Sequence, residues 1–255
     1  MLRRLRICLA ALALAAVPAL WASGSAEAAE AGTAAPLDDP AGGNFWSGYT
    51  ALNPPRTPFI WGWGPNYYGW GASANWVQPP IGCGAETNTV ASFWAGVGNS
   101  SGGPVERAGT DADCSGATHV NYAWYGTSLT SKITFGGAIN TGDSMTGRVA
   151  YLGGYCTFVV VDNTAGWSDA AVIPLTGTPA STEVVASIPT DGLTPLTKFT
   201  TVNFSAVALG GIGSSFDLTQ IPAITNSAGT PLNSISALGG SNLDNSFSVS
   251  WLRSS

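Results

Sequence analysis

The stretch that decides the fold is Ser181-Thr-Glu183-Val-Val-Ala-Ser187-Ile-Pro, followed after a short gap by Pro195-Leu-Thr-Lys-Phe199-Thr-Thr-Val-Asn-Phe204. Its two runs of β-branched and aromatic residues are separated by Pro, Thr, Asp and Gly, which favour turns. The pattern predicts one β-strand, a loop and a second strand. Glu183 and Ser187 are four residues apart, so in a regular strand their side chains point to the same face.

The rest of the chain repeats this pattern and shows almost no helical periodicity. Short runs rich in Val, Phe, Tyr, Trp and Thr alternate with Gly, Asn, Pro and Ser, which predicts an all-β fold, a sandwich or barrel of antiparallel strands. We predict strands at residues 90–96, 119–125, 131–135, 144–151, 155–162, 183–188, 201–207 and 246–252.

The first 28 residues are typical of a secretory signal peptide. Three arginines precede an apolar run at residues 7–20, and Ala26-Glu-Ala28 is a small-x-small cleavage pattern. The alternative is a membrane anchor, but no later segment approaches the roughly 18 apolar residues of a membrane span. We therefore expect a secreted protein that does not associate with a membrane. Residues 29–43 are expected to form a flexible lead-in, and residues 44–255 a single domain.

The composition excludes several classes of partner. Charged residues make up 9% of the chain and the net charge is −6, whereas a typical domain has about 25% charged residues. There is no basic stripe, so nucleic acid is not an expected partner. A surface built from Ser, Thr, Asn and Gly depends little on ionisation, which suits an acidic extracellular environment. We expect a monomer with no cofactor.

Three cysteines remain once Cys8 leaves with the signal peptide. Outside the cell a disulfide is the default, and Cys83 and Cys114 flank one apparent strand-turn-strand unit, so we predict a bridge between them. Cys156 lies in a strand-like run and is predicted to be a buried thiol. A metal site would need three or four ligands, and the chain has a single histidine, His119.

Residues 54–80 differ from the rest in composition, with Trp61, Trp63, Trp70 and Trp76 among tyrosines and glycines. One interpretation is a long loop whose aromatic side chains pack down on a sheet, since Trp is highly buried on average. The other is an exposed aromatic platform for a sugar or a polypeptide.

Seven further short motifs occur along the chain. They are Asn44-Phe-Trp46-Ser-Gly48-Tyr49, Asn75-Trp-Val77-Gln-Pro79, Ser92-Phe-Trp94-Ala-Gly96-Val-Gly98-Asn99, Val105-Glu-Arg107-Ala-Gly109-Thr110, Tyr122-Ala-Trp124-Tyr125, Gly142-Asp-Ser144 and Ser246-Phe-Ser-Val-Ser-Trp251. Together with the stretch around Glu183, their order resembles that of the eqolisins, or glutamic peptidases. The resemblance implies a concanavalin-like sandwich of two antiparallel sheets with a concave face that holds an extended peptide.

The resemblance also implies where the chemistry of the family would lie. Eqolisins use a Glu as general base toward water and a Gln that holds the oxyanion. The Gln position corresponds to Arg107. The family's Ala-Glu-Trp-Ile-x-Glu motif matches the stretch around Glu183, which corresponds to its first Glu, and the catalytic Glu, read as the second, corresponds to Ser187. Gly98 and Gly126 stand where the family has acidic residues.

No other residue completes the pair by spacing. Glu183 lies about 13 Å along the strand from Ser187, and Glu106 points to the face opposite Arg107. Asp111 and Asp113 are expected to serve a turn. With a guanidinium in place of the amide and a hydroxyl in place of the base, hydrolysis by the family's route is not expected.

The leading interpretation is therefore a peptidase homologue that has lost hydrolysis and keeps a polypeptide-binding groove. The groove is predicted to be lined by Trp94, Arg107, Tyr122, Trp124, Glu183 and Ser187. The first alternative is an active acid endopeptidase with a relocated pair, Glu106 or Asp111 acting with Arg107. The second is a carbohydrate-binding sandwich that holds polysaccharide on the aromatic segment at residues 61–76.

Overall fold

The computed structural model describes residues 45–52, 57–58, 68–84, 88–98, 106–127, 131–175, 179, 181–187, 194–210, 218–240 and 245–254. The chain divides into two units, residues 1–33 and 34–255, and every described residue belongs to the second. The predicted signal peptide and the lead-in at residues 29–43 lie outside the described residues. Within the described ranges, no helix is long and apolar enough to cross a membrane.

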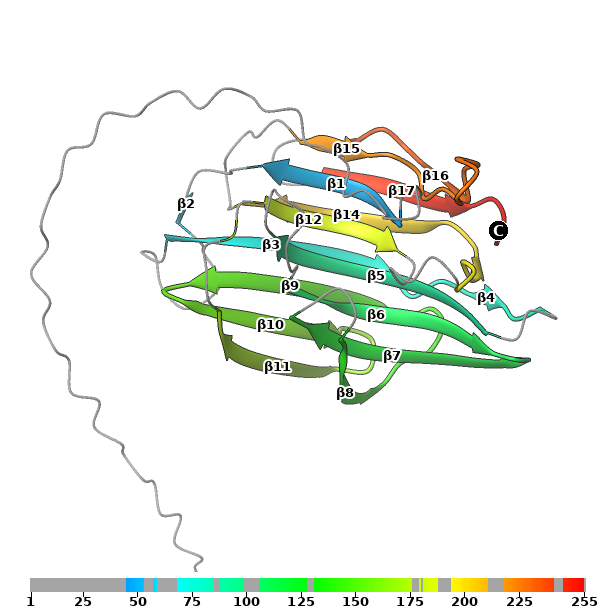
Figure 1. The fold of residues 1–255 in the computed structure, drawn as a ribbon. Coiled ribbons are helices and arrows are strands. Elements are labelled where there is room, and N and C mark those ends of the chain that lie inside the picture. Colours follow the sequence, from blue (N-terminus) through cyan, green and yellow to red (C-terminus); the bar gives the residue numbers. More distant parts are fainter. Residues whose placement is uncertain are drawn as a thin grey trace, which may run out of the picture. The chain divides into compact units, whose positions relative to one another are not determined.

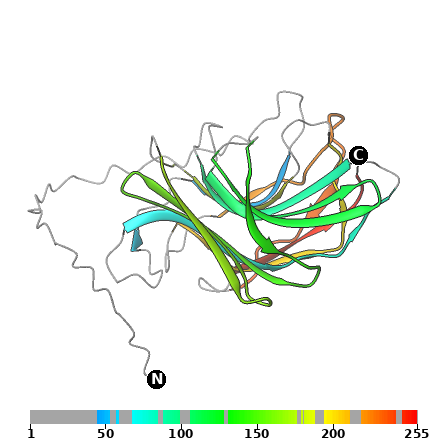
Figure 2. The same ribbon diagram turned by 90° about the horizontal axis from the view of Figure 1, so that it is seen from below.

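Two large antiparallel sheets make up the described domain, which confirms the prediction of an all-β sandwich (Figure 1). The seven-stranded sheet has the order β15 (Thr219–Ile221), β1 (Trp46–Leu52), β12 (Ser181–Ser187), β5 (Asn88–Gly98), β6 (Glu106–Ser115), β7 (Thr118–Gly126) and β8 (Ile133–Ala138). Figure 2 shows the strands of the two sheets as two curved layers.

The eight-stranded sheet has the order β11 (Trp167–Pro174), β10 (Tyr155–Asp162), β9 (Ser144–Leu152), β3 (Tyr68–Val77), β14 (Val202–Leu209), β17 (Asn245–Trp251) and β16 (Asn233–Ile235), with β2 (Thr57–Pro58) beside β3. A small third sheet pairs β13 (Lys198–Phe199) with β4 (Ile81–Gly82). The two strands predicted from residues 181–204 therefore lie in different sheets, as β12 and β14.

All eight predicted strands are present, with ends displaced by up to three residues. Among the strands that were not predicted, β3 and β6 are long and central. β6 is buried from Glu106 to Ala112, and a strand covered on both faces shows no apolar–polar alternation. Its sequence also carries charged residues, which are uncommon in strands.

The interior contacts distinguish the two faces of the seven-stranded sheet. Trp76 of β3 donates from Nε1 to Oγ1 of Thr110 at 3.1 Å, and the ring of Tyr125 on β7 contacts Phe158 on β10. Thr110 and Tyr125 therefore point toward the eight-stranded sheet, on what we call the inner face. Because strand side chains alternate, Arg107 on β6 and Trp124 on β7 point to the opposite, outer face.

The aromatic segment at residues 54–80 is not one long loop. Its second half forms β3, a ten-residue strand at the centre of the eight-stranded sheet. Trp76 is 2% exposed and belongs to the core, so it is not part of an exposed platform, and Trp70 is half-buried. Trp61 and Trp63 lie outside the described residues.

The cysteine predictions are confirmed. Cys83 and Cys114 form a disulfide with a Cα–Cα distance of 5.4 Å, which joins the end of β4 to β6. Cys156 is a free thiol buried on β10, and burial raises its pKa above the ordinary range. The disulfide closes a separation of 31 residues, which stabilises by about 3–4 kcal/mol in the chain-entropy model.

Candidate functional site

The strand registers align side chains of the outer face into rows that run across the seven-stranded sheet. One row, here called the Glu183 row, consists of Thr50, Glu183, Gly96, Arg107 and Gly126 on β1, β12, β5, β6 and β7. Directly paired residues of neighbouring strands share a face. Glu183 and Arg107 therefore face each other across β5, and the residue between them is a glycine.

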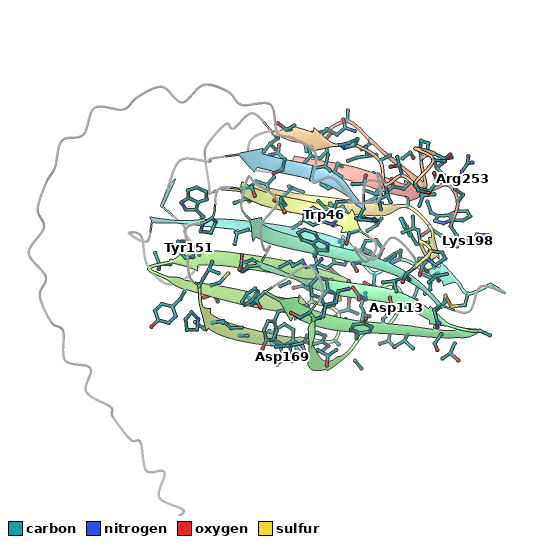
Figure 3. All side chains as sticks on the ribbon, in the orientation of Figure 1. Trp46, Asp113, Tyr151, Asp169, Lys198 and Arg253 are labelled. Atoms are coloured by element: carbon teal, nitrogen blue, oxygen red, sulfur yellow. A yellow bond between two sulfur atoms is a disulfide. The ribbon has the colours of Figure 1, made fainter. Side chains whose placement is uncertain are left out.

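A second row lies four residues further along the strands. This Asp111 row consists of Trp46, Ser187, Ser92, Asp111 and Tyr122. The row between the two carries Trp94 and Trp124. Trp46, which is labelled in Figure 3, packs edge-on against Trp94 at 5.1 Å between ring centroids. An indole layer thus separates the two polar rows.

The structure does not bring Ser187 and Arg107 together. The two residues lie in different rows, about 13 Å apart along the strand direction alone. The Ser187 hydroxyl accepts a hydrogen bond from Nε1 of Trp94 at 2.8 Å. In register, the carboxyl group opposite Arg107 across β5 belongs to Glu183, whereas the resemblance had paired Arg107 with Ser187.

Glu183 is a buried acid with one bound and one unbound oxygen. Its side chain is 3% exposed, and the Ser181 hydroxyl donates to Oε1 at 2.7 Å. Oε2 is also buried and has no hydrogen-bond partner among the described residues. Burial raises the pKa of Glu183 to about 7, against the opposing effects of the Ser181 hydrogen bond and the Arg107 charge.

Arg107 is held between aromatic rings. Its guanidinium carbon lies 5.5 Å from the ring centroid of Trp94 and 5.2 Å from that of Trp124, and the residue is 2% exposed. Burial lowers its pKa to about 10, while the charges of Asp111 and Glu183 act in the other direction. The guanidinium therefore stays charged at physiological pH and can donate hydrogen bonds to a negative oxygen.

Gly96 is required between the two charged groups. A Cβ atom there would lie 2.8 Å from the Trp94 ring and 2.9 Å from the carbonyl oxygen of Glu106. The absent side chain leaves room for the indole to fold over the backbone between Glu183 and Arg107.

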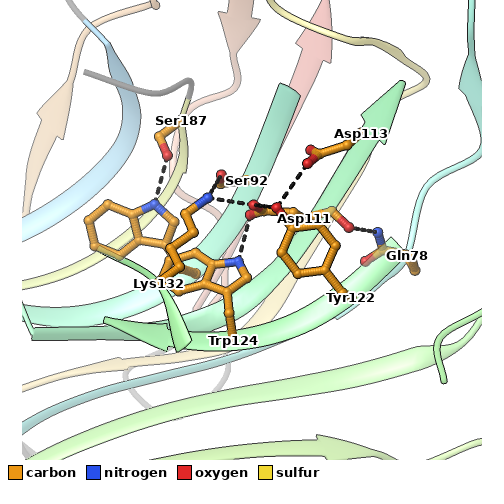
Figure 4. A network of polar contacts seen from close by, with 9 residues as sticks. Gln78, Ser92, Asp111, Asp113, Tyr122, Trp124, Lys132 and Ser187 are labelled. Atoms are coloured by element: carbon orange, nitrogen blue, oxygen red, sulfur yellow. Dashed lines mark hydrogen bonds and ion pairs between the residues drawn. The ribbon is translucent and has the colours of Figure 1, made fainter. Parts of the chain in front are cut away.

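Asp111 is the centre of a compact network on the outer face (Figure 4). Its carboxylate is fully buried, and Oδ1 accepts from Nε1 of Trp124 at 2.5 Å. Oδ2 accepts from Nζ of Lys132 at 2.5 Å and from the Tyr122 hydroxyl at 2.8 Å, and Lys132 also donates to Ser92 at 2.9 Å. Asp111 therefore lies inside a strand and binds three donors, which corrects the expected role in a turn.

The same Tyr122 hydroxyl also lies 2.8 Å from Oδ2 of Asp113. A hydroxyl has one hydrogen, so it can satisfy both contacts only if one of the two carboxyl groups carries a proton. Burial, reinforced by the charge of Asp111, raises the pKa of Asp113 to about 7. Asp113 is thus the protonated member, and it too lies within β6 rather than in a turn.

Glu106 lies on the inner face, as predicted, and so does not act at the same point as Arg107. Burial raises its pKa to about 7, with a smaller contribution from the charge of Glu183. Beneath Asp111, the inner face is fixed by Gln78, which accepts from Thr110 at 2.7 Å and donates to the Asp111 carbonyl at 3.2 Å. These bonds hold the backbone of β6 against the other sheet.

Sequence reasoning missed Ser181 and Lys132. Ser181 had a detectable signal, because it lies two residues before Glu183 and a strand places both on one face. Lys132 had none, since it precedes β8 and reaches Asp111 only through the pairing of β7 with β8. Within the described ranges, no group of three or more His, Cys, Asp or Glu side chains could hold a metal ion.

The protein is an all-β sandwich of two antiparallel sheets. The outer face of its seven-stranded sheet carries a buried carboxyl group, Glu183, and a buried guanidinium, Arg107. The model of the peptidase A4 family matches residues 70–247, and the chain belongs to that family. A comparison with curated protein sequences finds no match.

Solved structures of glutamic peptidases share the fold. Scytalido-glutamic peptidase with a peptide-based transition-state analogue aligns with a TM-score of 0.61 and 14% identity, over 82% of this chain and 98% of that one. SCP-B, a member of the eqolisin family in complex with the tripeptide Ala-Ile-His, aligns with a TM-score of 0.59 and 14% identity, with the same coverage. At this identity the likeness establishes the fold alone.

Proposed function

We propose that this protein is a secreted endopeptidase that binds an extended polypeptide on the outer face of its seven-stranded sheet, with Glu183 as general base and Arg107 as oxyanion donor. The observation that carries the proposal is the Oε2 atom of Glu183. It is a buried carboxylate oxygen without a partner among the described residues, on a residue in register with a buried guanidinium. An unsatisfied buried oxygen costs free energy, and such groups concentrate at functional sites.

The proposed reaction needs only these two groups, water and the peptide. Ionised Glu183 takes a proton from water through Oε2 as the water oxygen bonds to the carbonyl carbon. The carbonyl oxygen becomes negative and accepts hydrogen bonds from Arg107. Glu183 then gives the proton to the amide nitrogen as the C–N bond breaks, leaving a carboxylic acid and an amine, and Glu183 is ionised again.

Arg107 changes the family's chemistry in a definite way. A neutral amide donates without affecting the charge of the base, whereas a guanidinium adds a full positive charge close to the oxyanion. The base has a pKa of about 7, so it is half ionised at pH 7, mostly ionised above about pH 8 and protonated in acid. Cleavage is therefore expected near neutral pH and above, not in the acid range that the resemblance to eqolisins implied.

The class of ligand is supported by the family. Two solved structures with this fold hold a peptide-based analogue and a tripeptide. Secretion is supported by the signal-peptide pattern in the sequence and by the Cys83–Cys114 disulfide, since disulfides persist in oxidising compartments.

The test is digestion of denatured casein by the purified protein at pH 3.5 and pH 7.5, followed by mass spectrometry of the products. We expect internal cleavage at pH 7.5 that is absent from Glu183→Gln. Binding of peptides without turnover at either pH would contradict hydrolysis and support a peptide-binding protein without catalysis.

A further inference from the structure

Ser181 and Glu183 form a closed unit on one strand. They are two residues apart on β12, are 2% and 3% exposed, and are joined by the 2.7 Å hydrogen bond from Ser181 Oγ to Oε1. A hydroxyl that donates to a carboxylate fixes the rotamer of the carboxylate side chain. It also determines which of the two carboxylate oxygens is already hydrogen-bonded. The remaining oxygen is the one without a partner.

We propose, on the basis of the proposed function, that Ser181 is a positioning residue for the general base: its hydroxyl holds Oε1 of Glu183 and leaves Oε2 as the oxygen that receives the proton from water. Without this bond the carboxyl group can rotate and present either oxygen. Rotation away from the reacting water is costly, because a small misplacement of a catalytic group lowers the rate strongly.

On the neighbouring strands, the residues directly paired with Ser181 and Glu183 carry no carboxylate that could compete for the Ser181 hydroxyl. Its partners in register are Leu52 on β1 and Gly98 on β5, and those of Glu183 are Thr50 and Gly96, none of which titrates. The charged groups that act on Glu183 come from β6: Arg107 on the outer face and Glu106 on the inner face. Gly98 stands where the resemblance implied an aspartate, which would have placed a second carboxylate beside the Ser181 hydroxyl.

The bond also affects the acidity of the base. A donor to the ionised form favours that form, so Ser181 lowers the pKa of Glu183 against the effect of burial. Loss of the hydroxyl should raise this pKa by about 1, which corresponds to a hydrogen bond to a charged group.

The experiment uses Ser181→Ala, Ser181→Thr as a variant that keeps the hydroxyl, and Ser47→Ala as a matched control. Ser47 is a buried serine on the adjacent strand β1 whose hydroxyl has no partner among the described residues. The pKa of Glu183 is read directly by NMR of protein labelled with ¹³C at the Glu side-chain carboxyl. The full chain has five glutamates, and Glu183→Gln assigns the signal.

We expect Ser181→Ala to raise the titration midpoint of Glu183 by about 1 and to lower kcat/KM roughly tenfold or more through kcat, with the acid limb of the pH profile moved upward by the same amount. Ser181→Thr should restore both, and Ser47→Ala should change neither. An unchanged Glu183 midpoint in folded Ser181→Ala would overturn the proposal. Because the titration needs no substrate, absence of peptidase activity would refute the proposed function separately.

Discussion

The two polar rows on the outer face contain the same kind of group in opposite states. In the Asp111 row, a buried carboxylate accepts from an indole, a phenol and an ammonium group. In the Glu183 row, a buried carboxyl group has one donor, Ser181, and one oxygen without a partner among the described residues. The first is complete as it stands, and the second is arranged to accept something more.

This difference indicates a structural role for the Asp111 row and is consistent with the proposed catalytic role of the Glu183 row. A satisfied buried ion pair is costly to break, because removing one partner leaves the other charge buried and uncompensated. An unsatisfied buried carboxyl group instead weakens the fold and is retained where a reaction uses it. The two rows should therefore respond to matched amide substitutions in opposite ways.

The largest expected effect is on activity. Glu183→Gln removes the base but keeps the shape, so kcat/KM for a peptide substrate should fall by about 10³-fold. Thermal stability should be unchanged or slightly higher, because a neutral amide replaces a buried acid. Steady-state kinetics and calorimetry on one preparation check both. Retention of activity would show that another group is the base.

The matched substitution in the other row should mainly affect stability. Asp111→Asn leaves Lys132 without its carboxylate partner, which binds at 2.5 Å, and should lower the free energy of unfolding by about 3 kcal/mol. Equilibrium unfolding in denaturant measures this change in the free energy of unfolding. Lys132→Met should cost at least as much, because it leaves the fully buried Asp111 carboxylate without its cation, whereas the lysine is 21% exposed. Equal stability of Asp111→Asn and the native protein would contradict the structural role of this row.

The pH dependence of stability should be unusual in sign. The pKa values of Glu106, Asp113 and Glu183 are raised to about 7 in the folded protein. The folded state thus binds protons more tightly than the unfolded state, so stability is greatest below about pH 4 and is lost as pH rises through about 7. We expect Tm to be lower at pH 8 than at pH 4 by at least about 5 °C.

Glu183→Gln should reduce this dependence, because it removes one of the three groups. A Tm that rises between pH 4 and pH 8 would show that these carboxyl groups are not protonated in the folded protein.

The smallest effect is expected at the position that the resemblance placed in the catalytic pair. Ser187→Ala removes only the acceptor of the Trp94 indole hydrogen bond. It should cost about 1 kcal/mol of stability and change kcat/KM by less than about threefold, as measured with the same peptide substrate. A loss comparable with that of Glu183→Gln would restore Ser187 to the site.

The sequence predicts the fold well because strands leave local patterns. The alternating run at residues 155–162 became β10, and the cysteine spacing predicted the disulfide. The strand β6 was not predicted, because it is buried on both faces and carries Arg107, Asp111 and Asp113. No local sequence signal distinguished it from a charged turn.

The site was harder to predict because it depends on register. Ser187 and Glu183 both lie on the outer face of β12, and local sequence alone does not determine which of them faces Arg107 two strands away. That choice follows from the pairing of β12 with β5 and of β5 with β6. A one-residue change in either register would turn the side chains of a strand to the other face.

The measurement that tests the central claim most directly is the pH dependence of kcat/KM for cleavage of a fluorogenic peptide by the native protein, from pH 3 to pH 9. With Glu183 as the base, activity should be low in acid and rise through an acid limb with an apparent pKa of about 7. Cleavage that is fastest near pH 3 and declines toward neutrality would contradict the account.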